Sequence, residues 1–171
     1  MDFFHKVDDE DKIILVQKLP EAMVSQLMDE EEVENRIVKE DPLSLSIDKW
    51  NRIYSMIIDV NKLKEIPTIY YSTIEPYIGY KTCALCITSI AKFKELYGPL
   101  QSRESKCSLC PLKVVDCCLD EGSSYNKIEK LLEESTTDYP FDFEYQNSIG
   151  RIKREFLLAI EGMISSLKSL L

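Results

Sequence analysis

The stretch CALCITSIAKFKELYGPLQSRESKCSLCPLKVVDCC, residues 83–118, holds all six cysteines of the chain. It contains two Cys-x-x-Cys pairs, Cys83 with Cys86 and Cys107 with Cys110, which are separated by 20 residues. Pairs at this spacing are typical of a metal ion held by four thiolates. We therefore predict that Cys83, Cys86, Cys107 and Cys110 bind a metal and that the rest of the chain is organised around this stretch.

A helical pattern follows each of the two pairs. Apolar residues after Cys86 recur at helical spacing up to Gly98-Pro99, and Pro111 directly after Cys110 suits the first position of a helix. Both pairs are thus expected at helix N-termini, where the helix dipole favours the thiolate form that a metal requires.

Two cysteines remain, Cys117 and Cys118. A helix over residues 111–118 would carry Cys117 about 10 Å along its axis from Cys110. In that case both cysteines lie outside the site, and at least one of them is a small buried apolar residue. If the segment is instead a loop, Cys118 or Cys117 could replace Cys83 as a ligand, and this alternative stays open.

Zinc is the favoured metal, because the two pairs offer the four thiolates that a closed tetrahedral zinc site takes. An iron–sulfur cluster is the alternative, since Cys110 precedes Pro111 and further cysteines are spare. A third possibility is a site without metal, including one with disulfides. A thioredoxin-like redox pair is disfavoured because no βαβ pattern surrounds either motif.

Residues 1–62 are expected to form the N-terminal helices. The acidic run at residues 8–11 before KIILVQKL (12–19) predicts a first short helix. A second helix is predicted from Pro20 to Glu40. A third is predicted over 41–62, where apolar residues follow the i, i+3, i+4, i+7 rule: Leu43, Ile47, Trp50, Ile53, Tyr54, Ile57 and Ile58. Trp50, the only tryptophan, is expected to anchor the core rather than to be a binding hot spot.

Residues 63–82, LKEIPTIYYSTIEPYIGYKT, are expected to form a structured connector. They carry two prolines, a glycine and four tyrosines, and their β-favouring run suggests at most one short strand. The tyrosines are expected to pack on the helices rather than to stack on bases, because a stacking platform normally sits in a basic groove.

Residues 119–171 predict two further helices. Gly122 and the serines after it form a turn and cap for a short helix, and residues 135–144 form a loop. A final helix over 145–171 would be roughly 40 Å long. Its apolar stripe is expected to belong to the core, with a two-helix interface as the alternative, and Gly162 is expected at a close helix crossing. The stripe comprises Tyr145, Ile149, Ile152, Phe156, Ile160, Met163, Leu167 and Leu170.

The whole chain has 171 residues, 44% of them hydrophobic and 30% charged, which predicts a single soluble domain of mainly α class. Residues 83–118, the cysteine module, are expected to be a metal-binding insertion between the N-terminal helices and the long C-terminal helix. No apolar run reaches the roughly 18 residues that cross a bilayer, and the N-terminus lacks a secretory signal. We expect a cytoplasmic protein with no membrane partner.

The order LSIDKWNRI, CALC, CSLCPL and then Cys118 resembles a scattered set of small uncharacterised phage and prokaryotic proteins. These carry a helix with a tryptophan, a Cys-x-Leu-Cys pair, a Cys-x-x-Cys-Pro pair and a further cysteine. The similarity covers about residues 43–118. It implies a metal-stapled helical module of viral or mobile-element origin, which would place the protein in the host cytoplasm. Because the pattern usually retains its final cysteine, the resemblance speaks against excluding Cys118.

The favoured function is that of a non-enzymatic interaction protein, which binds a protein partner or a second copy through its C-terminal helix. The alternative is a nucleic-acid-associated regulator with a structural zinc or iron–sulfur site, motivated by the paired cysteines and by Arg151, Lys153 and Arg154. The net charge of −9 argues against broad phosphate binding.

An enzyme is disfavoured because the chain has a single histidine, His5, and no phosphate-binding loop or nucleophile elbow. Asp116 and Glu104 lie near the cysteines, but four thiolates leave no metal position open for water.

Overall fold

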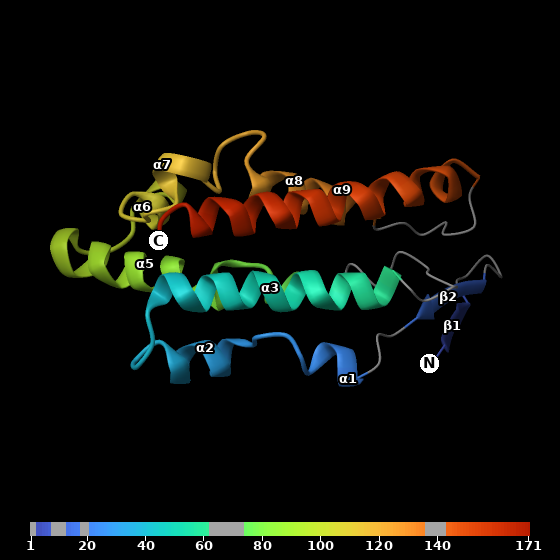
Figure 1. Cartoon of the computed structure of the whole chain (residues 1–171), viewed down its shortest axis with the longest axis horizontal. Coiled ribbons are helices and arrows are strands. Elements are labelled where there is room, and N and C mark those ends of the chain that lie inside the picture. The colour runs from blue at the N-terminus through green and yellow to red at the C-terminus, as the bar shows by residue number, and fades with distance from the viewer. Residues whose placement is uncertain (1–2, 8–12, 18–20, 62–73, 136–142) are drawn as a thin grey trace.

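The computed structural model describes residues 3–7, 13–17, 21–61, 74–135 and 143–171. Within them the protein is mainly α-helical, as predicted, and Figure 1 shows its longer helices running side by side along the long axis. None of the helices in these ranges combines the length and the apolar composition that a bilayer span requires.

A β-hairpin opens the chain. Strand β1 (Phe3–Val7) pairs antiparallel with β2 (Ile13–Gln17), so that Phe3 lies opposite Gln17 and Val7 opposite Ile13. The predicted first helix over residues 12–19 is therefore wrong. Both strands are rich in β-branched and aromatic residues, which lose rotamer freedom in a helix and fit a pleated pair.

The predicted helix over residues 20–40 is two helices, α1 (Glu21–Val24) and α2 (Glu30–Arg36). The break comes before Asp29, whose carboxylate accepts a hydrogen bond of 2.8 Å from the backbone N–H of Glu32 and so caps α2. In a continuous helix the N–H of Glu32 would bond to a backbone carbonyl of the preceding turn. Here the Asp29 side chain accepts that hydrogen bond instead, so a new helix begins after Asp29.

Three long helices form the helical core: α3 (Pro42–Asn61), α8 (Ser124–Ser135) and α9 (Phe143–Lys168). Helix α9 contacts both α3 and α8, and Figure 1 shows it running alongside α3. The predicted helix over 41–62 is confirmed, and Trp50 is buried at 3% exposure in the core, as expected for an anchor. Apolar side chains from all three helices share one cluster, including Ile53, Met56, Ile57, Ile128, Leu131, Ile152, Phe156 and Ile160.

The apolar stripe of the long C-terminal helix α9 is packed in the core of the protein. Ile152, Phe156 and Ile160 have no exposed surface, and Met163 and Leu167 retain 1% each. The interpretation of this stripe as core is therefore confirmed for the described residues. Gly162 marks a close crossing, because a Cβ there would stand 2.9 Å from the Oγ of Ser124 in α8.

The cysteine module contains three helices: α5 (Ala84–Tyr97), α6 (Arg103–Cys107) and α7 (Lys113–Asp116). Figure 1 shows them gathered at one end of the molecule, where α3 begins and α9 ends. Asp116 joins α7 to the helical core, since its carboxylate accepts hydrogen bonds of 2.9 Å from the N–H of Ser124 and from the hydroxyl of Ser166.

The second half of the connector consists of two 3₁₀ turns, η1 (Glu75–Tyr77) and η2 (Tyr80–Thr82). Tyr77 packs against the core, as expected, whereas Tyr80 is 46% exposed and lies under the ammonium of Lys106. Tyr70, Tyr71 and most of the run that suggested a short strand lie outside the described residues.

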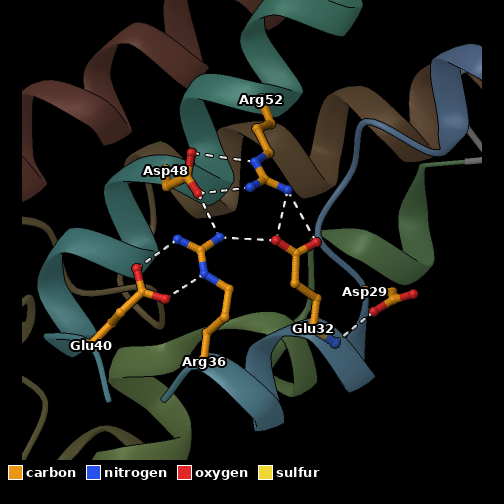
Figure 2. Close-up of polar contacts among 6 residues, drawn as sticks. All are labelled: Asp29, Glu32, Arg36, Glu40, Asp48 and Arg52. Atoms are coloured by element: carbon orange, nitrogen blue, oxygen red, sulfur yellow. Dashed lines mark hydrogen bonds and ion pairs between the residues drawn. The ribbon is translucent and has the colours of Figure 1, made fainter. Parts of the chain in front are cut away.

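An ion-pair network fastens α2 to α3 (Figure 2). Arg36 of α2 pairs with Asp48 of α3 at 2.8 Å, and Arg52 of α3 pairs back to Glu32 of α2 at 2.8 Å. Arg36 also pairs with Glu40 at 2.6 Å, which holds the pKa of that carboxyl below its usual range. The two helices are thereby joined by charges as well as by apolar contacts.

Candidate metal centre

Four cysteines from three separate segments line one cavity of about 290 Å³, here called the thiol cavity. Cys83 and Cys86 come from the start of α5, Cys107 from the end of α6, and Cys118 from the chain after α7. Its wall also includes apolar side chains of the helical core, among them Trp50, Met163 and Leu167. Thiols that are distant in the sequence thus line one cavity, whose wall is completed by apolar side chains of the helical core.

The first Cys-x-x-Cys pair lies at a helix N-terminus, as predicted. Cys83 is the N-cap residue of α5, with extended backbone angles, and Cys86 lies in the first turn. The backbone N–H of Leu85 is bonded to the hydroxyl of buried Ser46 in α3 at 3.3 Å, which ties this turn to the helical core. The position of both thiols is therefore set by α3 as well as by α5.

The second pair was expected at the N-terminus of a helix over residues 111–118. This part of the prediction is wrong, because only Lys113–Asp116 is helical and Cys107 ends the preceding helix. Cys107 is the last residue of α6, and Cys110 lies in the turn before the four-residue helix α7. Pro111 is exposed and lies in the turn that directly precedes α7. The pair consequently spans a bend: Cys107 lines the thiol cavity, but Cys110 does not.

The geometric reason for excluding Cys118 does not hold, because the expected helix over residues 111–118 ends at Asp116. Cys117 has extended backbone angles of −62° and 122°, which turn the chain back toward the core. Cys118 then lines the thiol cavity, while its neighbour Cys117 is buried at 8% exposure outside the cavity wall. Cys117 fits the expected role of a small buried apolar residue.

Cys110 is buried beside apolar and hydroxyl groups. It belongs to the apolar cluster of the core, and burial raises the pKa of its thiol to about 11, against the smaller opposing effects of the Leu112 backbone and the Ser89 hydroxyl. A thiol in this setting favours the neutral form.

Thiolate character in the cavity is concentrated on Cys83. A hydrogen bond from Cys86 lowers the pKa of Cys83, and the ammonium of Lys49 and the hydroxyl of Ser46 add to this effect. The same hydrogen bond and burial raise the pKa of Cys86. Burial raises the pKa of Cys118 and, more weakly, that of Cys107. Metal binding would have to displace these protons.

Lys49 is the site residue that the sequence analysis missed. Its side chain is 1% exposed, and its Nζ donates hydrogen bonds of 2.8 Å to the Ile78 carbonyl and 3.1 Å to the Gly79 carbonyl. Burial lowers the pKa of Lys49, and the nearby thiols Cys83, Cys86 and Cys118 oppose this effect. A visible signal existed: Lys49 stands between Leu45 and Ile53 at four-residue steps, on the buried face of its helix.

The two carboxylates considered as partners of a metal-bound water have other positions. Asp116 is engaged with Ser124 and Ser166, and Glu104 is exposed at the start of α6. The side chain of His5 lies outside the side chains that the structure describes. Neither carboxylate lines the thiol cavity.

All six cysteines are free in the structure, so it contains no disulfide between them. Within the described residues, no group of three or more His, Cys, Asp or Glu side chains is arranged to hold a metal ion as it stands. A metal in the thiol cavity therefore requires the cysteine side chains to turn toward a common point. The donor set itself, several thiols in a partly apolar cavity beside a buried cation, suits zinc or an iron–sulfur cluster.

No protein-family model, no curated protein and no solved structure matches the chain.

Proposed function

We propose that the protein is a non-enzymatic helical interaction protein whose cysteine module is fastened by a thiolate-bound metal. The observation that carries the proposal is the thiol cavity, where Cys83, Cys86, Cys107 and Cys118 face one space beside buried Lys49. Four thiols that converge from three segments supply the donor set of a closed zinc site, and a metal held by four thiolates contributes directly to folding.

A structural rather than catalytic metal follows from the donor set. When four thiolates surround one zinc, no coordination position stays open for a water molecule. Asp116 and Glu104, the acidic residues considered for such a role, do not line the cavity, and Glu129 is the carboxylate that does. The proposed centre therefore stabilises a fold and leaves function to the protein surface.

The interaction partner is a protein or a second copy of this chain. Self-association through the buried stripe of α9 would require the core to open, because those side chains have almost no exposed surface. The available part of α9 is its outer side, where Leu158 is 64% exposed beside a groove between α8 and α9. We therefore assign self-association to that outer side.

The nucleic-acid alternative loses part of its support in the ion pairs, while Arg154 of the same basic cluster is exposed. Arg151 of the basic cluster is paired with Glu155 at 2.8 Å and also with Glu134. Lys153 is half-buried, and burial lowers its pKa. A cluster compensated in this way offers little charge to phosphates. Binding to DNA or RNA at low salt that weakens as salt increases would restore this alternative.

Two measurements test the proposal. Elemental analysis and a visible spectrum of untagged protein, purified without oxygen, should show about one zinc per chain and no colour, or else iron with a brown colour. Protein that is folded and free of both metals would contradict the metal centre.

Light scattering coupled to size-exclusion chromatography then tests the surface. A wild-type dimer that becomes a monomer in Leu158→Glu supports self-association. The matched variant Leu96→Glu, on the exposed end of α5, should leave the dimer intact.

A further inference from the structure

The thiol cavity differs from the rest of this acidic chain in its charge. Three cations line it, namely Lys49, Arg103 and Lys106, against a single carboxylate, Glu129. The chain as a whole carries a net charge of −9. A wall enriched in cations within an acidic protein indicates that the cavity is built for an anionic occupant.

A thiolate centre meets this description. Four thiolates around one divalent ion leave a charge of −2, and thiolate-bound iron–sulfur clusters are also anionic. Lys49 is the only charged side chain that is buried among the residues whose side chains the structure describes. A buried ammonium is costly without a partner charge, and the thiols of the cavity are the groups that can supply it.

We propose that Cys83, Cys86, Cys107 and Cys118 hold the metal, with Cys118 in place of Cys110, and that Lys49 is the buried counter-charge of the centre. This inference rests on the proposed metal-fastened function and specifies its ligands. Cys110 and Cys117 are buried and lie outside the cavity wall, although Cys110 is within electrostatic range of Cys83 and Cys107. The four remaining cysteines match the number that a closed thiolate site needs.

Lys49 also positions the ligands. Its ammonium holds the carbonyls of Ile78 and Gly79, and Thr82 reinforces the same turn by donating to the carbonyls of Tyr77 and Gly79 at 2.8 and 3.2 Å. This turn leads directly into Cys83. The cation therefore neutralises the centre and fixes the approach of the first ligand.

The ligand set is tested with three alanine variants of neighbouring or paired cysteines: Cys110→Ala, Cys117→Ala and Cys118→Ala. Metal content is measured after anaerobic purification. We expect Cys118→Ala to lose most of its zinc or iron, whereas Cys110→Ala and Cys117→Ala keep the wild-type amount. Loss of metal in Cys110→Ala, or its retention in Cys118→Ala, would overturn the ligand set and leave the metal centre itself standing. Wild-type protein without metal would instead overturn the proposed function.

A fourth variant keeps the test independent of folding. Cys118→His replaces one thiolate by an imidazole that still binds zinc or cobalt. In cobalt-loaded protein the thiolate-to-metal absorption should fall from that of four thiolates to that of three. The same substitution at Cys117 should leave the band unchanged, and an unchanged band in Cys118→His would overturn the proposal. Zinc and iron as native occupants are distinguished by the metal content and colour of the wild type.

The counter-charge is tested with Lys49→Met against Thr82→Val. Both variants weaken the turn over residues 77–82, but only Lys49→Met removes charge. We expect the metal affinity, measured by competition with a chelator, to fall roughly 10- to 100-fold in Lys49→Met, as is usual for residues that support metal ligands. In an iron-containing wild type, the reduction potential should shift in Lys49→Met alone. Equal affinities and potentials in the two variants would show that Lys49 is merely structural.

Discussion

The helical core and the cysteine module are held together by different forces. In the core, side chains such as Phe156 and Ile160 on α9 are fully buried against α3 and α8. In the module, Leu96, Tyr97 and Val114 are 57%, 65% and 84% exposed, and two of the three helices are shorter than two turns. Burial of apolar surface stabilises the core, whereas the module buries fewer apolar side chains, among them Ala84, Leu85 and Leu112, and depends more on polar links and on its thiols.

Metal removal should separate the two regions most strongly. Structural zinc contributes on the order of 10 kcal/mol in small zinc-dependent domains, and the buried apolar side chains of the module, such as Leu85 and Leu112, would replace only part of it. We expect chelation to abolish the hydrogen-exchange protection of amides in α5, α6 and α7 while those of α3 and α9 keep theirs. Equal losses in both regions would contradict this division, and unchanged exchange throughout would argue against a metal that fastens the module.

A core substitution should have the next largest effect. Phe156→Ala deletes a fully buried ring and should lower the free energy of unfolding by about 3–5 kcal/mol. The control is Leu96→Ala in the module, whose exposed side chain predicts a change within about 0.5 kcal/mol. Chemical denaturation followed by circular dichroism measures both. Similar losses for the two variants would contradict the assignment of stability to the core.

The difference between the regions also explains what could be predicted from the sequence. Helices α3 and α9 were predictable because their apolar residues repeat at helical spacing over many turns. These residues are buried in one core cluster. The hairpin was missed because β-branched runs as short as those of β1 and β2 resemble buried helix segments. The break at Asp29 was missed because a cap depends on one hydrogen bond rather than on a periodic pattern.

The candidate site follows the same distinction. The proximity of Cys83 and Cys86 was predictable because only two residues separate them on one turn. Cys118 was excluded on an assumed helix, and only the bend at Cys117 brings it back to the cavity. Lys49 lies 34 residues from Cys83 in the chain. The helical pattern indicates that Lys49 is buried, but it does not indicate that Lys49 and Cys83 line the same cavity.

The link between the two regions should be the next most sensitive point. Asp116→Ala removes the carboxylate that accepts from Ser124 and Ser166, and it leaves the first N–H of α8 without this partner. We expect a loss of about 1–3 kcal/mol in the free energy of unfolding. Exposed Asp120 provides the control, because Asp120→Ala removes the same charge four residues later. The two losses should differ clearly in urea denaturation, and equality would show that Asp116 is not a structural link.

The ion pairs between α2 and α3 should contribute less. Arg36→Met should cost about 1 kcal/mol, because partly exposed pairs are screened by solvent, and the cost should shrink at high salt. Since the folded-state pKa of Glu40 is lowered, this contribution is present above the usual carboxyl pKa and is lost as the pH falls through the folded value. Lys39→Met, which removes an exposed charge on the same segment, should show neither dependence in denaturation curves at varied salt and pH.

The smallest effects are expected at two glycines of α9, Gly150 and Gly162, and they test the contact between α8 and α9. Gly150→Ala should stabilise the protein by up to about 1 kcal/mol, because the new Cβ meets only an arginine tip at 3.7 Å and alanine favours the helix. Gly162→Ala should lose that gain, because its Cβ would lie 2.9 Å from the Oγ of Ser124. The backbone of Ser124 is held by Asp116, so only its hydroxyl can give way. Adding Ser124→Ala to Gly162→Ala should therefore restore the gain. Thermal melts of Gly162→Ala, Ser124→Ala and the double variant, beside the wild type, measure this coupling. If Gly162→Ala alone stabilised the protein as much as Gly150→Ala, the helices would not be in close contact at this point.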